Sequence, residues 1–305
     1  MGKLALVFPG QGSQKPGMGA DLAVEFEAAA AIYRRAGEIV GWHVADVSFN
    51  GPEAKLNQTG FAQVALYVNS MAVMEVLKQR GVSGDVVSGH SLGEYSALAA
   101  AGAVSFEEGL ELVAARGMAM ADAAQERPGQ MAAVLGLEDA DVEAICAAAG
   151  EVWPVNYNCP GQVVVSGEAQ SVQRAMARAR EAGARKAVQL PVSGAFHSPC
   201  MRSAAGVMKE RLAGTGFREP QPPFFSSISC RYEVATGLAG LLVSQMVSPV
   251  RWSQAVASMV ADGVDRFLEV GNGKVLTGLI RRINRDVAAA SVSDPASLNQ
   301  IRSEE

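Results

Sequence analysis

The stretch whose residue types point most clearly to catalysis is Gly-His-Ser-Leu-Gly at residues 89–93. It follows apolar residues 86–87 and precedes an alanine-rich segment. A Gly-x-Ser-x-Gly turn between a strand and a helix is typical of a nucleophile elbow. Gly89 and Gly93 permit the tight turn that exposes Ser91 Oγ at the start of a helix, whose free N–H groups point toward developing negative charge. The motif also occurs by chance in a glycine-rich chain, so other residues must supply a base and a substrate anchor.

Three histidines are candidates for the general base. His90 adjoins Ser91, and neighbouring side chains around a turn usually diverge, so it is a poor proton acceptor. His43 lies in a segment with no other chemical signal. His197 directly follows an expected strand in a loop of small residues, and it is therefore the predicted base.

A candidate substrate anchor lies on the helix that follows the elbow. Ser105 and Glu108 form a capping-box pattern that predicts the helix start. Arg116 and Met120 are four residues apart on one face, beside the apolar stripe of this helix. An arginine in such a place often packs its stem and keeps its charge in water. The pattern leaves that interpretation and a functional one open.

Two glutamines lie in or next to segments that are otherwise apolar. The apolar strand predicted at residues 3–8 ends in a Pro-Gly-Gln-Gly loop, which puts Gln11 at the edge where α/β sheets bind ligands. This loop lacks the Lys-Ser/Thr end of a phosphate-binding loop. Gln63 begins a helix predicted over residues 57–80 that is apolar on most of its circumference. The Gln63 side chain could equally form a structural hydrogen bond or contact a substrate in the site.

Composition favours a folded α/β enzyme. The chain has 305 residues, of which 49% are hydrophobic and 19% charged, enough to bury one large domain or two unequal ones. The net charge of −5 argues against nucleic acid as the main partner.

The four cysteines form no C-x-x-C pair and have no metal-site spacing with the histidines, so reduced thiols and no metal are expected. The apolar run at residues 4–8 is too short for a signal peptide, and no uninterrupted run has the length of a membrane helix. We expect a soluble cytoplasmic protein.

The order of the expected elements predicts an inserted small domain. Strands are expected at residues 131–137, 153–157, 162–166 and 186–192, and helices at 139–149 and 169–182. This β-α-β-β-α-β order is that of a ferredoxin-like unit. The prediction is a small domain over residues 128–192, inserted in a larger α/β domain formed by 1–127 and 193–305.

Together these features resemble the malonyl-CoA:acyl carrier protein transacylases over nearly the full chain. The matching blocks are Phe-Pro-Gly-Gln-Gly-Ser-Gln at 8–14, Gly-His-Ser-Leu-Gly-Glu-Tyr at 89–95, Arg-Gly at 116–117, Asn-Tyr-Asn at 156–158, Val-Ser-Gly at 165–167, Gly-Ala-Phe-His-Ser at 194–198, Ser-Pro-Val-Arg-Trp at 248–252 and Glu-Val-Gly at 269–271. No single block is decisive, but their order and spacing are highly specific.

The resemblance implies an α/β-hydrolase-like large domain with a parallel central sheet, and acyl transfer in two steps. Ser91 would attack a malonyl thioester, with His197 as general base and then acid. A main-chain carbonyl, at Gln245 here, would orient the histidine in place of an acidic residue. The backbone N–H groups of Gln11 and Leu92 would form the oxyanion hole.

The resemblance also implies the substrate contacts. Arg116 would bind the free malonyl carboxylate through two parallel N–H bonds. Phe196 would crowd an α-methyl branch, and Asn156 would position the coenzyme A or pantetheine arm. Met120 and Gln63 complete the candidate substrate-binding residues. No cofactor is implied, since malonyl-CoA is the substrate.

An acidic acyl carrier protein is the partner that the resemblance implies, bound transiently by a monomer with no nucleic acid or membrane contact. Its docking needs cationic surface, for which the candidates are Arg174, Arg178, Arg185, Lys186, Lys274, Arg281 and Arg282. Each is also compatible with an ordinary solvated surface.

Several alternatives remain open at this point. A stand-alone acyltransferase of a polyketide synthase would use the same catalytic residues as a fatty acid enzyme. A serine esterase or lipase would share the elbow, but it usually carries an HGGG-like loop and an acidic triad member, and neither is evident here. A non-catalytic binding module would not need Ser91, His197 and Gln11 together.

Overall fold

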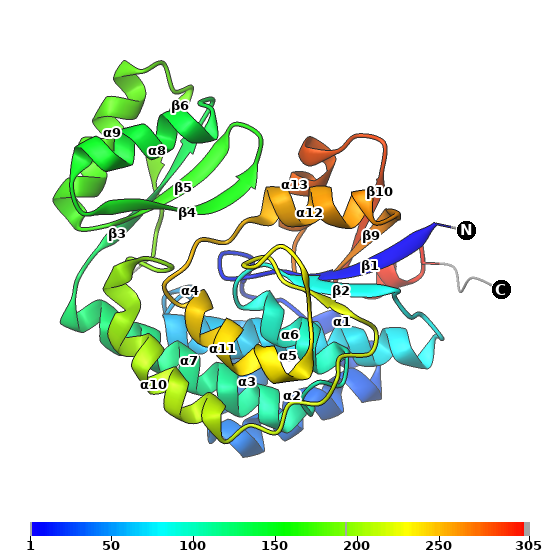
Figure 1. Cartoon of the computed structure of the whole chain (residues 1–305). Helices are drawn as coiled ribbons and strands as arrows, with labels where there is room; N and C mark the ends of the chain where they lie inside the picture. Colours follow the sequence, from blue (N-terminus) through cyan, green and yellow to red (C-terminus); the bar gives the residue numbers. More distant parts are fainter. Residues whose placement is uncertain (1, 193, 302–305) are drawn as a thin grey trace.

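Two β-sheets organise the chain in the computed structural model, which describes residues 2–192 and 194–301 (Figure 1). The large sheet has the order β10-β9-β1-β2-β7-β8 and is parallel except for the last strand. Its strands are β1 (Lys3–Phe8), β2 (Val86–Gly89), β7 (Phe224–Phe225), β8 (Tyr232–Glu233), β9 (Val264–Val270) and β10 (Ala288–Val292). The predicted mixed α/β class with a parallel central sheet is confirmed.

The small sheet is antiparallel throughout and has the order β4-β5-β3-β6. Its strands are β3 (Gln130–Leu135), β4 (Val152–Cys159), β5 (Gln162–Gly167) and β6 (Lys186–Gln189). Helices α8 (Asp139–Ala149) and α9 (Ala169–Glu181) alternate with these strands in the predicted order, and they share a core with the sheet.

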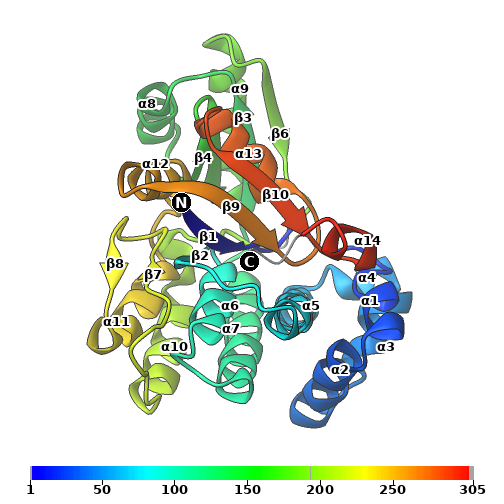
Figure 2. The ribbon, with the colours of Figure 1, turned by 90° about the vertical axis from the view of Figure 1, so that its right-hand side faces the viewer.

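The other helices surround the large sheet, packed either against its faces or against the helices that cover them. They are α1 (Ala20–Glu25), α2 (Glu27–Val40), α3 (Val44–Asn50), α4 (Glu53–Leu56), α5 (Thr59–Gln79), α6 (Gly93–Ala100), α7 (Phe106–Glu126), α10 (Arg202–Ala213), α11 (Ala235–Gln245), α12 (Trp252–Ala261), α13 (Val275–Ile283) and α14 (Pro295–Leu298). Figure 2 shows α5, α6 and α7 on one face, and α12 and α13 with the small sheet on the other.

The central strand β1 is apolar because both of its faces are covered. Leu6 and Phe8 belong to the core shared with α5 and α7, whereas Ala5 and Val7 belong to the core shared with α12 and α13. Alternate side chains of a strand point to opposite faces, so an unbroken apolar run fills both cores. The carboxyl ends of β1 and β2 are thereby held rigidly side by side.

Helix α5 is long and apolar enough to cross a membrane by length and composition, but 83% of its most apolar window is buried inside the protein. A helix that is hydrophobic on all sides is typical of the core of a large domain. The burial predicted for residues 57–80 is confirmed.

The two sheets are joined by backbone hydrogen bonds. Tyr157 N donates to the carbonyl of Val250 at 2.9 Å, and Val250 N donates to the carbonyl of Val155 at 2.8 Å. The segment before α12 thus runs beside β4, and it holds the small sheet against the carboxyl edge of the large one.

Some predicted boundaries are wrong. The strand expected at residues 131–137 ends at Leu135. Strand β7 ends after two residues, because Ser226 and Ser227 turn inward to hydrogen-bond Glu94. The strand expected to run to residue 192 ends at Gln189. In contrast, the short apolar run at residues 288–292, which we had not assigned, forms the edge strand β10.

Candidate active site

The predicted nucleophile elbow is present between β2 and α6. Ser91 has a φ of 54°, a left-handed conformation that non-glycine residues rarely adopt. A Cβ on Gly89 would lie 2.0 Å from the Gly93 carbonyl carbon, and one on Gly93 would lie 2.0 Å from the Phe8 carbonyl oxygen. The two glycines are therefore required for this turn, which strains Ser91 and exposes its hydroxyl.

His197 lies directly against this serine. Its Nε2 is 2.7 Å from Ser91 Oγ, although the two residues are 106 positions apart in the sequence. His197 is 5% exposed and also has a left-handed φ, of 59°. The structure thus brings together the nucleophile and base that the sequence suggested.

A main-chain carbonyl is the third group in the hydrogen-bonded series that begins with Ser91 and His197. Gln245 is the last residue of α11, and the last carbonyls of a helix have no partner within it. Its oxygen lies 2.9 Å from His197 Nδ1. Because a carbonyl can only accept, Nδ1 carries the proton and Nε2 is free to accept one from Ser91. The negative end of the helix dipole also favours the imidazolium formed during reaction.

The surroundings of His197 keep its ring neutral in the free protein. The pKa of His197 is lowered from 6.5 to about 3. Burial is the larger cause of this shift, and the nearby charge of Arg116 is the second. The neutral imidazole is the form that can act as a general base.

Arg116 lies behind the serine and is 1% exposed. Its Nη2 donates to Ser91 Oγ at 3.2 Å and to Gln245 Oε1 at 3.0 Å, and its Nη1 donates to Gln63 Oε1 at 2.7 Å. The ring of Tyr95 lies 5.5 Å from the guanidinium carbon. The interpretation of Arg116 as a snorkelling surface residue is therefore wrong.

The charge of Arg116 has no direct counter-ion. Every hydrogen-bond acceptor that it contacts is neutral, and none of the ion pairs in the described part of the chain includes it. Burial lowers the pKa of Arg116, but a guanidinium stays protonated in proteins. A buried, unpaired cation beside a nucleophile is a site for the anionic part of a substrate.

Two backbone N–H groups are the predicted oxyanion donors. Leu92 follows Ser91 at the start of α6, and Gln11 follows β1 in the adjacent loop. Among residues 2–192 and 194–301, neither N–H donates a hydrogen bond to another protein group. Gln11 lines the same cavity as Ser91 and His197, as an oxyanion donor must.

This cavity of about 180 Å³ lies between the two sheets. Of the predicted substrate-binding residues, Met120, Asn156 and Phe196 line it. Gln63 is fully buried and does not; it binds Arg116 and donates from Nε2 to Met120 Sδ at 3.2 Å. Gln63 therefore supports the anchor instead of facing the cavity.

Sequence reasoning missed two polar contacts of the site. Asn158 lies on β4 and its side-chain oxygen is 3.0 Å from His90 Nε2, which joins the elbow to the small sheet. Glu94 is completely buried in the first turn of α6, where its carboxylate accepts from Gln245 Nε2 at 2.6 Å. The sequence signal for the Glu94–Gln245 contact was an acidic residue directly after the Gly-x-Ser-x-Gly motif, where the helix that follows the elbow is buried.

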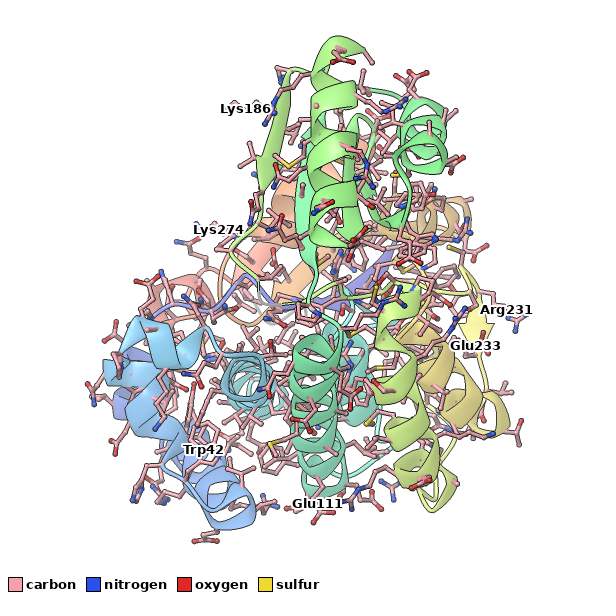
Figure 3. The ribbon with its side chains drawn as sticks, turned by 90° about the vertical axis from the view of Figure 1, so that its left-hand side faces the viewer. Trp42, Glu111, Lys186, Arg231, Glu233 and Lys274 are labelled. Carbon is pink, nitrogen blue, oxygen red and sulfur yellow. The ribbon has the colours of Figure 1, made fainter. Side chains whose placement is uncertain are left out.

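A larger hollow of about 640 Å³ lies far from the elbow, where Figure 3 shows Trp42 and Glu111. Its lining is mainly apolar and contains neither a serine nor a histidine. The chemistry of the molecule is therefore concentrated in the smaller cavity.

The fold and the site are those of an acyltransferase, since a family model described as acyl transferase domain matches residues 5–300. The chain belongs to the family of malonyl CoA-acyl carrier protein transacylases. It is 40% identical over 305 residues to the Bacillus subtilis member, which covers 98% of this chain and 96% of that protein. The Escherichia coli (strain K12) member is 39% identical over 303 residues, with 98% of each chain covered.

Solved structures agree with this assignment. An acyl carrier protein S-malonyltransferase from Vibrio cholerae superposes with a TM-score of 0.95 at 42% identity, covering 98% of this chain and 100% of that one. A malonyl-transacylase in complex with a type II PKS acyl-carrier protein has the same TM-score at 39% identity, with 98% of both chains covered. The resemblance stated from the motifs is confirmed.

Proposed function

We propose that this enzyme transfers the malonyl group of malonyl-CoA to the phosphopantetheine thiol of an acyl carrier protein through a malonyl-serine intermediate, in fatty acid biosynthesis. The observation that carries the proposal is the buried guanidinium of Arg116, which touches the nucleophile and has only neutral acceptors. The names of the relatives, as malonyl CoA-acyl carrier protein transacylases, support the same substrate pair.

In the first half-reaction, His197 Nε2 takes the proton of Ser91 as Oγ attacks the thioester carbonyl. The oxyanion is stabilised by the N–H groups of Gln11 and Leu92. As the tetrahedral intermediate collapses, the imidazolium returns its proton to the coenzyme A sulfur. In the second half-reaction, His197 deprotonates the carrier thiol, which attacks the ester carbonyl. As this second tetrahedral intermediate collapses, the imidazolium returns the proton to Ser91 Oγ, and the free serine and the neutral histidine are regenerated.

The substrate carboxylate is proposed to bind the guanidinium fork of Arg116, displacing its contact with Ser91 Oγ. A planar fork matches a carboxylate with two parallel bonds, which lysine cannot do. Phe196 and Met120 line the cavity near the serine, where Phe196 would crowd an α-methyl branch. Asn156 lines the wall formed by β4 and is proposed to contact the pantetheine arm. The proposed steps use only side chains and N–H groups of this chain, so no cofactor is invoked.

A loading assay tests the proposal. Malonyl-CoA should add one malonyl mass to the wild-type protein in a fast-quench intact-mass measurement, carrier protein should remove it, and Ser91→Ala should gain none. Arg116→Ala should lower malonyl kcat/KM by about 30-fold or more, because losing one partner of a buried charge pair costs about 2–5 kcal/mol. Acetyl loading by Arg116→Ala should be retained.

Arg127→Ala provides the matched control, because Arg127 follows the end of the same helix and forms an exposed ion pair with Glu151. This variant should load both acyl groups as the wild type does. An equal loss of malonyl and acetyl loading in Arg116→Ala would show that Arg116 has a structural role only.

Carrier docking is proposed at the mouth of the cavity. Lys186 on β6 and Lys274 before α13 are exposed and lie on one side of the molecule (Figure 3). Of the other candidates, Arg174, Arg281 and Arg282 are exposed but donate to acceptors within the protein, which makes them less available. Positive charge at this mouth would attract an acidic carrier protein.

The finer architecture is proposed from the same observations. The β-α-β-β-α-β order and sheet order β4-β5-β3-β6 support a ferredoxin-like small domain over residues 128–192. Residues 1–127 and 193–305 would form the α/β-hydrolase-like large domain, although residue 193 itself lies outside the described residues. We also propose a monomeric enzyme in the cytoplasm, a location supported by four free cysteines.

A polyketide role is the second candidate, favoured by the structural match to a malonyl-transacylase bound to a type II PKS acyl-carrier protein. The same catalytic residues would serve both pathways, so only the preferred carrier protein distinguishes them. Comparing discharge rates with the carrier proteins of each pathway would decide between the two.

A further inference from the structure

Glu94 is a buried carboxylate that the proposed reaction does not use. It lies on α6, three residues after the nucleophile, and its side chain is 0% exposed. An ionised carboxylate in such a place is costly unless hydrogen bonds compensate it. The chain supplies those bonds from two separate segments.

One carboxylate oxygen binds the turn after β7. Glu94 Oε1 accepts from Ser226 Oγ at 2.9 Å, from Ser227 N at 2.7 Å and from Ser227 Oγ at 3.0 Å. The single proton of Ser227 Oγ is shared with the Gly89 carbonyl, 2.8 Å away, so Ser226 Oγ and Ser227 N are the donors that anchor this oxygen to the turn after β7. The orientation of the carboxylate is therefore fixed independently of the catalytic groups.

The other oxygen determines which way the Gln245 amide faces. Glu94 Oε2 accepts from Gln245 Nε2 at 2.6 Å, and the same nitrogen donates to the Ser91 carbonyl at 3.1 Å. With its nitrogen facing two acceptors, the amide must turn Oε1 toward Arg116, whose Nη2 lies 3.0 Å away. A flipped amide would place its N–H groups against the guanidinium.

Gln245 thereby connects two parts of the site. Its side chain positions Arg116, and its main-chain carbonyl positions His197. Glu94 is the only carboxylate among the described residues with a hydrogen bond to Gln245, and it does not bond Arg116 directly. This separation leaves the guanidinium fork available to a substrate carboxylate.

We propose that Glu94 is a positioning residue for malonyl selectivity, which acts by fixing the Gln245 amide so that Arg116 presents its guanidinium to the substrate carboxylate. The proposal rests on the proposed role of Arg116. Glu94 does not touch the reacting atoms, so its effect must pass through Gln245 and appear in the preference for malonyl over acetyl groups.

The test variant is Glu94→Gln, which keeps the size of the side chain but replaces one acceptor oxygen by a donor. Its new N–H group would face either Gln245 Nε2 or the donors of Ser226 and Ser227, so the network cannot be satisfied in its present form. Loading of wild type and variant is measured with malonyl-CoA and acetyl-CoA. The malonyl-to-acetyl ratio of kcat/KM should fall about tenfold, which corresponds to about 1.4 kcal/mol.

Glu269→Gln is the matched control. Glu269 is also a fully buried carboxylate, but it accepts from Leu276 N, Thr277 N and Thr277 Oγ1 at the start of α13. This change should lower Tm without altering the malonyl-to-acetyl ratio. The comparison separates loss of a buried carboxylate in general from loss of the one that binds Gln245.

A double-mutant cycle supplies the second measurement. Gln245→Leu keeps the main-chain carbonyl but removes the amide, so adding Glu94→Gln to it should not lower the ratio further. If both substrates lose rate equally in Glu94→Gln, or if the two effects on the ratio simply add, the positioning role is excluded. A ratio that rises would also overturn it, because Glu94 would then act as a charge opposing the substrate. Arg116→Ala in the same series tests the underlying role of Arg116 separately.

Discussion

The two walls of the active-site cavity differ in how their polar groups are held. The large-sheet wall contains Ser91 and His197, with Arg116 directly behind the serine, and these side chains are bonded to one another and to Gln245. The small-sheet wall presents Asn156 and other amide and apolar side chains from β3, β4 and β5. Preorganised groups stabilise transition states, whereas the second wall can supply binding to the parts of the substrate that do not react.

Burial of charged or chargeable groups explains why the large-sheet wall is so extensively hydrogen-bonded. Its cation and imidazole are both nearly inaccessible to solvent, so each needs fixed partners, and those partners also fix its geometry. In the carrier-docking arrangement proposed above, the small-sheet wall adjoins the mouth of the cavity and its exposed lysines. We therefore expect substitutions on the first wall to affect kcat and those on the second to affect KM.

The largest effect is expected for His197→Ala. Because general acid–base catalysis contributes about 10²–10⁴-fold, the malonyl loading rate should fall by that range. KM for malonyl-CoA should stay close to its wild-type value, since Arg116 remains in place. Single-turnover loading measured by rapid quench checks this, and a rise in KM with unchanged kcat would contradict the division between the walls.

A smaller effect is expected for Asn158→Leu on the small-sheet wall. The change removes the hydrogen bond to His90, and one such bond contributes about 0.5–1.5 kcal/mol. KM for coenzyme A and carrier substrates should rise several-fold while kcat changes little. Steady-state kinetics with each substrate measures both constants; if kcat falls instead, the small sheet takes part in positioning the nucleophile through His90.

A still smaller effect should follow from reversing charge at the cavity mouth. In Lys186→Glu with Lys274→Glu, KM for the acidic carrier protein should rise a few-fold and the difference should disappear at high salt, because exposed charges are screened. Loading from malonyl-CoA by itself is the internal control and should not involve carrier docking. Equal KM values at low and high salt would place the carrier elsewhere.

The smallest change is expected in the acidic limb of the pH profile. Because the pKa of His197 is lowered to about 3, the ring stays a neutral proton acceptor as pH falls below its ordinary 6.5. Acetyl loading, in which the substrate has no carboxylate, should therefore keep a nearly constant kcat/KM from neutral pH down to well below 6.5. A midpoint near 6.5 in stopped-flow loading would show that His197 is solvated.

The same pKa shift has a consequence for stability. Below pH 6.5 the unfolded chain binds a proton at His197 that the folded protein does not, so this group contributes a loss of stability as pH falls. Substrate binding should partly reverse the shift, because a carboxylate at Arg116 would offset the charge that lowers the pKa. The kcat profile for malonyl should then have its acidic midpoint above that of kcat/KM.

The sequence by itself determined the local features of this protein. Gly89 and Gly93 around Ser91 predicted the elbow, Ser105 and Glu108 predicted the start of α7, and both predictions are confirmed because turn and cap chemistry are local. The apolar runs at residues 3–8 and 86–87 located the central strands β1 and β2. The edge strand β10 was missed because its alanine-rich sequence has a weak strand propensity and is paired only with β9.

Only the tertiary structure decided how the polar side chains combine. Whether Arg116 snorkels or is buried depends on α5 and α11 packing against its helix, and these lie 53 and 129 positions away at Gln63 and Gln245. The place of Glu94 beneath the site likewise depends on a turn more than 130 residues later. Such contacts leave no periodic signal in the sequence, because each pairs single residues that the folding of the whole sheet brings together.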